Sequence, residues 1–178
     1  CKLTMYWYDG SGLWTITANA SDSSARNSSN ITQTFFIGAL DAFVTAPTAM
    51  TWSSLSAGAV NQNATNNPIT LNNTGNINKH IRVNSTNLRG ETNPNLALWA
   101  ANFSVSAESA CRAQNMTDHN YANITSATLP KGNFTINNGT EAQDKLTVCV
   151  NLVGTDLTAQ SYSTANETSW TIQIVTQG

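Results

Sequence analysis

The chain has 178 residues and a formal net charge of −2, and only 10% of its residues are charged. It has no Lys/Arg cluster, which excludes the electrostatic footprint of nucleic-acid and anionic-lipid binding, and no apolar run approaches the roughly 18 residues of a membrane span. Hydrophobic residues at 40%, with five Trp and five Phe, exceed what disordered chains contain, so we expect the chain to fold.

Residues 1–37 are predicted to form three β-strands. Apolar and polar side chains alternate over residues 1–8, and the glycine-containing residues 9–12 (DGSG) are typical of a tight turn. The same alternation predicts a second strand over residues 14–19 and a third over residues 31–37. Three strands make one sheet, whereas a sandwich needs a second one, so this segment is incomplete by itself.

The apolar side chains of this segment are the candidate subunit interface. Side chains point alternately to the two faces of a strand, so each expected strand gathers its apolar residues on one face. We predict an interface formed by Leu3, Met5, Trp7, Trp14, Ile16, Phe35 and Ile37. Two other interpretations stay open for the aromatic residues Tyr6, Tyr8 and Trp14, namely sandwich core and an exposed platform for sugar rings.

Residues 38–50 are expected to connect this segment to a larger unit, with Pro47 marking the boundary. We therefore predict a three-stranded segment over residues 1–47 and a β-sandwich domain over residues 48–178. Helix signals are nearly absent, and only residues 91–101 would support a short helical turn, which Pro94 limits.

The larger unit contains short strand candidates separated by clusters of Asn, Gly and Ser. Such spacing is typical of an all-β protein with an Ig-like or jelly-roll β-sandwich. The candidates are residues 50–55, 68–72, 79–87, 102–107, 124–129, 134–137, 145–153 and 169–176, the last with Trp170, Ile172 and Ile174 on one face.

The N-glycosylation sequon N-x-[ST] is the strongest local signal in the chain. With 24 Asn, and 42 Ser and Thr among 178 residues, composition alone predicts roughly six sequons. The chain has twelve, which favours a glycan-coated exterior, although the compositional bias of a polar β surface stays open as an alternative. They lie at Asn19, Asn27, Asn30, Asn63, Asn72, Asn84, Asn102, Asn115, Asn123, Asn133, Asn138 and Asn166. Strand alternation places Asn84, Asn102 and Asn133 on the polar face, where glycans project into solvent.

The chain has three cysteines. Cys111 and Cys149 are 38 positions apart without a CxxC partner, so we expect a disulfide in an oxidising compartment rather than a zinc site. Cys1 is left over, and its partner could be an upstream residue, a neighbouring subunit or a lipid.

Two stretches resemble known families. Residues 12–36 (GLWTITANASDSSARNSSNITQTFF) resemble the closing strands of Ig-like repeats in secreted surface proteins. Residues 52–83, with W..L..G followed by PITLNNTGN and IRV, resemble the opening of β-sandwich domains in archaeal surface-layer and pilus-like proteins. The resemblance covers about a third of the chain. It implies an extracellular structural role and transfers no catalytic residue.

Catalytic chemistry is not indicated. The two histidines, His80 and His119, have no second ligand at metal-binding spacing, and no G-x-S-x-G motif supports a triad with Asp118. Asp9 and Asp22 could hold Ca²⁺ with loop carbonyls, but the twelve-residue calcium loop is absent. We therefore expect no enzyme activity and no cofactor apart from N-linked glycans.

These features predict an extracellular, cell-surface protein that acts by assembly. The favoured hypothesis is a structural subunit of a filament, sheath or surface layer, a polymeric homo-oligomer built through β-strand contacts. A surface adhesin or carbohydrate-binding module is the first alternative, and a viral capsid or spike jelly roll is the second.

Overall fold

Strands form nearly all the regular structure of this protein. The computed structural model describes residues 2–28, 31–108, 111–132 and 142–176, and within them the only helical element is the 3₁₀ turn η1, Ala100–Asn102. The strands are β1 Gly12–Ala18, β2 Ile31–Ile37, β3 Phe43–Ala46, β4 Val60–Asn63, β5 Ile69–Asn73, β6 Lys79–Ser85, β7 Leu88–Gly90, β8 Ala97–Leu98, β9 Phe103–Ser106, β10 Gln114–Asn115, β11 Asn120–Asn123, β12 Gln143–Leu152, β13 Tyr162–Ser163 and β14 Thr171–Thr176. The all-β prediction is confirmed.

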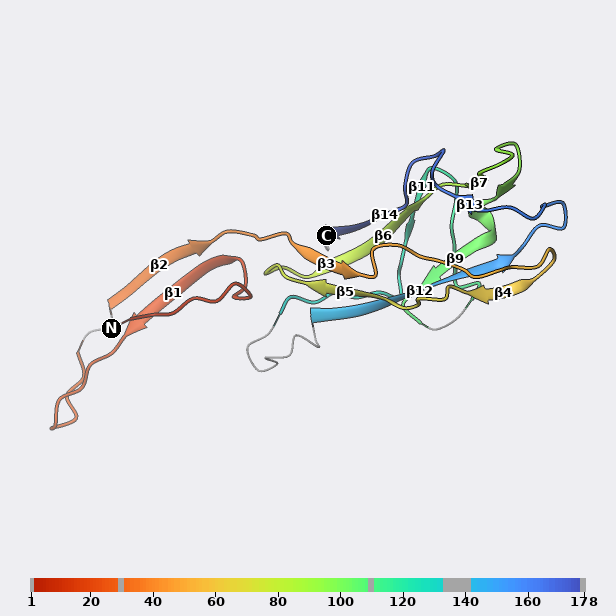
Figure 1. Cartoon of the computed structure of the whole chain (residues 1–178). Helices are drawn as coiled ribbons and strands as arrows, with labels where there is room; N and C mark the ends of the chain where they lie inside the picture. The colour runs from red at the N-terminus through yellow and green to blue at the C-terminus, as the bar shows by residue number, and fades with distance from the viewer. Residues whose placement is uncertain (1, 29–30, 109–110, 133–141, 177–178) are drawn as a thin grey trace.

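The strands pair into antiparallel sheets. The largest has the order β10-β9-β12-β5-β3, with β4 also pairing with β12, and it packs beside a three-stranded sheet of order β11-β6-β14 (Figure 1). A small sheet, β13-β7-β8, and the separate hairpin β1-β2 complete the described strands. Two packed antiparallel sheets agree with the predicted β-sandwich, and the Ig-like or jelly-roll type stays a prediction.

Alternating side chains explain how β6, the middle strand of the three-stranded sheet, packs one face against the core. Ile81 and Val83 are buried with the other odd-numbered residues of β6, whereas His80, Arg82 and Asn84 are half-buried on the outer face. On that outer face the Arg82 guanidinium lies 4.2 Å from the ring centroid of Tyr121 in β11, a cation–π contact that links neighbouring strands.

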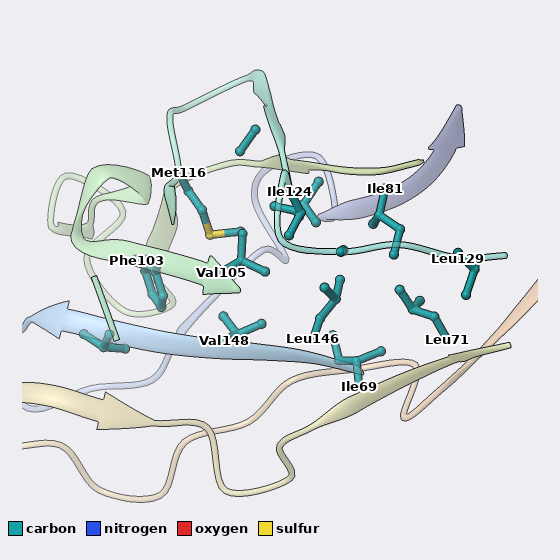
Figure 2. Close-up of a cluster of buried hydrophobic side chains, with 14 of the residues drawn as sticks. Ile69, Leu71, Ile81, Phe103, Val105, Met116, Ile124, Leu129, Leu146 and Val148 are labelled. Carbon is teal, nitrogen blue, oxygen red and sulfur yellow. The ribbon is translucent and has the colours of Figure 1, made fainter. Parts of the chain in front are cut away.

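A hydrophobic core fills the space between the sheets. Phe103 is completely buried, and its ring makes edge-to-face contacts with Trp52 and Trp170 at centroid distances of 5.4 and 5.0 Å. Figure 2 shows the aliphatic side chains that continue this core from both sheets, among them Ile69, Leu71, Ile81, Val105, Leu146 and Val148. Trp170 packs against the core with Ile172 and Ile174, as their shared face on the last strand predicted.

Within residues 1–37 the described part of the chain forms two strands, β1 and β2, so the prediction of a further strand over residues 1–8 is wrong. Cys1 lies outside the described residues, and residues 2–8 belong to no strand. Instead, the Asp9 carboxylate accepts a hydrogen bond from the Tyr6 amide at 2.7 Å, and the Asp9 amide donates to the Tyr6 carbonyl at 3.0 Å. This tight turn bends the chain before residues 2–8 can run alongside β1.

Two other strand candidates, 50–55 and 124–129, are irregular in the structure. Their apolar side chains still pack against the core, which explains the strand-like composition, and the second segment pairs only through an isolated bridge between Leu129 and Lys79. The candidate at 134–137 lies outside the described residues. The predicted boundary at residue 47 lies directly after β3. Because β3 pairs with β5 from Phe43 to Ala46, this strand belongs to the sandwich and not to the hairpin before it.

Side-chain hydrogen bonds and an ion pair hold the connection between the hairpin β1-β2 and the sandwich. Asn76 accepts a hydrogen bond from the Leu40 amide at 2.7 Å and donates to the Gly38 carbonyl at 3.0 Å. The ammonium of Lys79, which is buried at the start of β6, lies 2.6 Å from the Asp41 carboxylate. Buried polar groups need such partners, so residues 38–42 are held against the sandwich.

We expect Phe103→Ala to lower the free energy of unfolding by about 3–5 kcal/mol, because it removes a buried ring and leaves a cavity. Phe36→Ala is the matched control, since Phe36 is 72% exposed and its truncation should change stability by less than about 0.5 kcal/mol. Urea unfolding of the monomeric protein measures both values. Equal effects of the two substitutions would contradict the placement of Phe103 in the core.

Candidate assembly interface

The hairpin β1-β2 has one predominantly apolar face. Directly paired residues share a face, and the register pairs Trp14 with Phe35 and Gly12 with Ile37, with Ile16 on the same side. The Trp14 and Phe35 rings are in contact, with centroids 6.3 Å apart. We call Trp14, Ile16, Phe35 and Ile37 the apolar face of the hairpin. The opposite face carries threonines, with Leu13 and Phe36 at one end.

This apolar face lies largely open to solvent. Trp14 is 37% exposed and Ile16 is 42% exposed, while Phe35 and Ile37 are half-buried. Of the fourteen large hydrophobic side chains exposed among the described residues, nine lie within residues 3–40. Because a patch of this kind is rare on a monomer surface, the hairpin is the candidate binding surface of the chain.

The seven predicted interface residues divide into two groups. The four on β1 and β2 form the apolar face, whereas Leu3, Met5 and Trp7 are exposed but lie outside the sheet. The Trp7 ring packs close to the backbone of Gly132, and the neighbouring Lys131 ammonium donates a hydrogen bond to the Tyr8 carbonyl at 3.2 Å. The segment before β1 therefore contacts the sandwich.

Three consecutive aromatic residues form a surface cluster before β1. The Tyr6 and Tyr8 rings stack with centroids 5.2 Å apart, and Trp7 meets Tyr8 edge-to-face at the same distance. Partial desolvation, together with Tyr6 and Asp9, raises the pKa of Tyr8 above its usual value. Stacked aromatic rings at the surface are suited to contact another apolar or ring-shaped surface.

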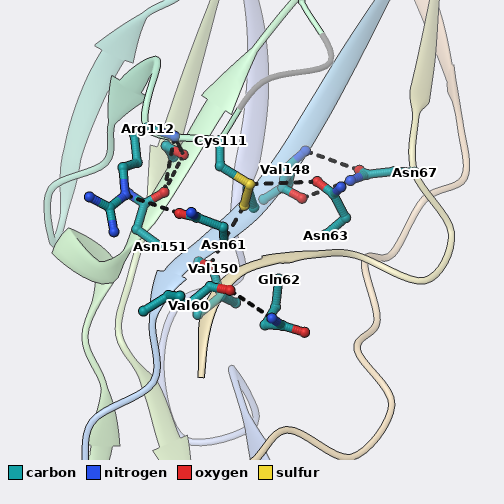
Figure 3. Close-up of a disulfide and its surroundings, with 12 residues drawn as sticks. Val60, Asn61, Gln62, Asn63, Asn67, Cys111, Arg112, Val148, Val150 and Asn151 are labelled. Atoms are coloured by element: carbon teal, nitrogen blue, oxygen red, sulfur yellow. Dashed lines mark hydrogen bonds between the residues drawn. A yellow bond between two sulfur atoms is a disulfide. The ribbon is translucent and has the colours of Figure 1, made fainter. Parts of the chain in front are cut away.

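The predicted disulfide is present between Cys111 and Cys149. Cys149 is completely buried in β12, and the two Cα atoms are 5.3 Å apart. Figure 3 shows the bridge beside β4, where Asn61 accepts a hydrogen bond from Arg112 at 3.0 Å and Asn63 lies near Cys111 Sγ. The bridge ties the loop after β9 to the central strand of the large sheet. It is compatible with an oxidising, extracellular setting.

The described sequon asparagines lie at the surface. Six are exposed and three are half-buried, whereas none is buried. The exposed ones are Asn19, Asn27, Asn63, Asn115, Asn123 and Asn166, and the half-buried ones are Asn72, Asn84 and Asn102. The sequons at Asn30, Asn133 and Asn138 lie outside the described residues. Asn84 takes the outer face of β6 as strand alternation predicted, while Asn102 lies in η1.

The buried asparagines lie outside the sequons. Asn73, Asn76 and Asn87 are at most 4% exposed, and each uses its side-chain amide to satisfy backbone groups. Asn73 donates to the carbonyls of Ile77 and Pro130 at 2.9 and 3.0 Å. The sequence analysis did not distinguish these buried asparagines from surface ones. One usable signal is that none of the three belongs to a sequon.

The acidic and histidine residues considered for chemistry have structural partners. Asp22 accepts hydrogen bonds from backbone amides of its own loop, as Asp9 does in its turn. Asp118 accepts from Asn87 at 2.7 and 3.0 Å, and His119 Nε2 lies 3.8 Å from it. In the part of the chain that the structure describes, no three His, Cys, Asp or Glu side chains are grouped to hold a metal ion.

Together these features define the class as an all-β, sandwich-like protein with a disulfide and an exposed apolar hairpin. None of the described segments forms a helix of the length and apolarity needed to cross a membrane. No protein-family model matches the chain, and neither curated proteins nor solved structures give a match.

Replacing both Cys111 and Cys149 by alanine should lower the free energy of unfolding by about 3–4 kcal/mol, because the bridge closes a long loop in the unfolded chain. Chemical denaturation of the monomer measures the loss. Cys1→Ala is the control and should leave stability unchanged. A double variant as stable as the parent would contradict a stabilising role for the bridge.

Proposed function

We propose that this chain is a structural subunit of an extracellular filament, sheath or surface layer, and that it assembles into a polymer of identical subunits through β-strand contacts of the hairpin β1-β2. The observation that carries this proposal is the exposed apolar face of a hairpin that pairs with no other described strand.

An isolated two-stranded hairpin is only marginally stable in water, and it needs a further strand or a packed surface. Here β1 and β2 pair only with each other among the described strands, and Figure 1 shows them extending beyond one end of the sandwich. Their free edges can also accept further strands, because main-chain donors and acceptors there are unpaired. A neighbouring subunit supplies both the missing surface and the missing strand.

The extracellular setting is supported by two features. The disulfide between Cys111 and Cys149 is of the type that persists in oxidising compartments. None of the nine described sequon asparagines is buried, so glycans can be attached without disturbing the core. Glycans on the sandwich would block unwanted lateral contacts and leave the hairpin as the preferred contact surface.

Electron microscopy of the protein isolated from its source, with mass spectrometry of the same sample, tests this function. We expect regular filaments or lattices and glycan mass on several of the twelve sequon asparagines. Monodisperse single particles would contradict a structural subunit, and closed symmetric shells would favour the capsid alternative.

A carbohydrate-binding module is the second candidate function, and the exposed ring cluster Tyr6-Trp7-Tyr8 favours it. Aromatic faces at a protein surface can stack on sugar rings. On this alternative, glycan-array binding by a monomer would be lost in Trp7→Ala or Trp14→Ala. An array without signal for the parent protein would exclude the alternative.

A further inference from the structure

A long groove opens along one side of the sandwich. It has a volume of about 1300 Å³, and its walls are the irregular segment 47–57 and the segment 157–164, which contains β13. Its floor contains core side chains of both sheets, including Val105 and Leu146 from the large sheet and Val83 from the three-stranded sheet. These floor side chains are at most 5% exposed, so the accessible apolar surface of the groove comes from half-buried wall residues such as Met50, Trp52 and Leu157.

The groove is uncharged, because none of the described residues that line it carries a charged side chain. Its walls combine serine and threonine hydroxyls with apolar side chains such as Met50, Trp52 and Leu157. Burying an unpaired charge against such a surface is costly, so the fitting occupant is an uncharged segment with apolar side chains. The two hairpin strands, GLWTITA and ITQTFFI, have this composition and carry no charge.

The strand β14 borders this groove and has a free edge. It pairs with β6 on one side, and no other described strand pairs with it. Trp170, just before β14, and Ile172 within it line the groove. A strand added beside β14 would therefore place its inward side chains over the groove. β14 has six residues and each hairpin strand has seven, so the lengths match along nearly the whole edge.

We propose that the groove and the free edge of β14 form the acceptor site for the hairpin β1-β2 of a second copy of this chain. This inference rests on the proposed function and names the surface that the hairpin binds. One hairpin edge pairs with β14 and extends the sheet β11-β6-β14, while the apolar face of the hairpin covers the groove.

The hairpin of the same chain does not occupy this site. Figure 1 shows β1 and β2 beyond the end of the sandwich near β3, while β4 and β13 lie toward the other end. Donor and acceptor are thus different surfaces of one subunit, which makes the contact head-to-tail and allows an open chain of subunits. No sequon asparagine lies in β1 or β2 or among the described residues that line the groove, whereas Asn19 and Asn27 lie in the loop that joins the two strands, so glycans there would project from one end of the hairpin.

Two lysine variants test this contact in the full-length protein. Ile16→Lys places a charge on the apolar face of the hairpin and disables the donor, and Thr15→Lys is its control on the opposite face. Ser169→Lys places a charge at the exposed rim of the groove and disables the acceptor, and Thr128→Lys, which is exposed and lies outside both the groove and β14, is its control. All four positions are solvent-exposed in the single chain, and thermal melts check that each variant folds.

Sedimentation velocity and native mass spectrometry measure assembly. We expect each disabled variant alone to need at least about tenfold higher concentration to assemble, while both controls assemble like the parent. An equimolar mixture of the disabled variants should form one-to-one dimers and nothing longer, because each pair retains one intact hairpin and one intact groove.

Two outcomes would overturn the acceptor site while leaving the proposed function intact. Either Ser169→Lys assembles like the parent, or the mixture stays monomeric although the parent polymerises. An isologous contact between two hairpins would give the first of these results. A parent protein that remains monomeric would instead overturn the proposed function, and the acceptor site with it.

Discussion

Strand β12 pairs with three other strands, and the rest of the sandwich depends on that pairing. Along one edge it pairs with β9, and along the other it pairs first with β5 and then with β4. At Val148, between these two partners, the Asn67 side chain makes the hydrogen bonds that a neighbouring strand would otherwise make. Its amide accepts from the Val148 amide at 3.0 Å and donates to the Val148 carbonyl at 2.8 Å. A one-residue slip of β12 would turn its core side chains to the outer face and move Cys149 away from Cys111.

The abundance of asparagine follows from the low charge of the chain. An amide side chain offers both a donor and an acceptor, so it can satisfy backbone groups in irregular segments without bringing a charge into the interior. Asn67, Asn76 and Asn87 do this beside β12, at the hairpin connection and next to Ala100. The described sequon asparagines are exposed or half-buried, so at the surface the same residue type has a second use as a glycan acceptor site.

Sequence alternation predicted the longer strands that pack against the core and both strands of the hairpin, but it failed for residues 2–8 and for short polar strands. In β6 and β14 it works because one face packs against the core, which forces apolar residues to every second position. It fails for residues 2–8, where alternation continues without a partner strand, and for β4, whose polar sequence VNQN is held by pairing with β12. The apolar face of the hairpin was predictable from side-chain period, whereas the groove was not, because distant segments form its walls.

In the single chain, the hairpin and the groove each leave apolar side chains without a covering partner. The hairpin has an apolar face that no described strand covers, and the groove has apolar wall residues, such as Met50, Trp52 and Leu157, that are only half-buried. Exposed apolar surface of this kind opposes solubility, so a chain that retains two such surfaces gains stability when they meet. Since they lie on different parts of the molecule, a pair of subunits leaves one of each unsatisfied. On the proposed contact, this gain would recur with every added subunit, which is the energetic requirement for growth in one direction.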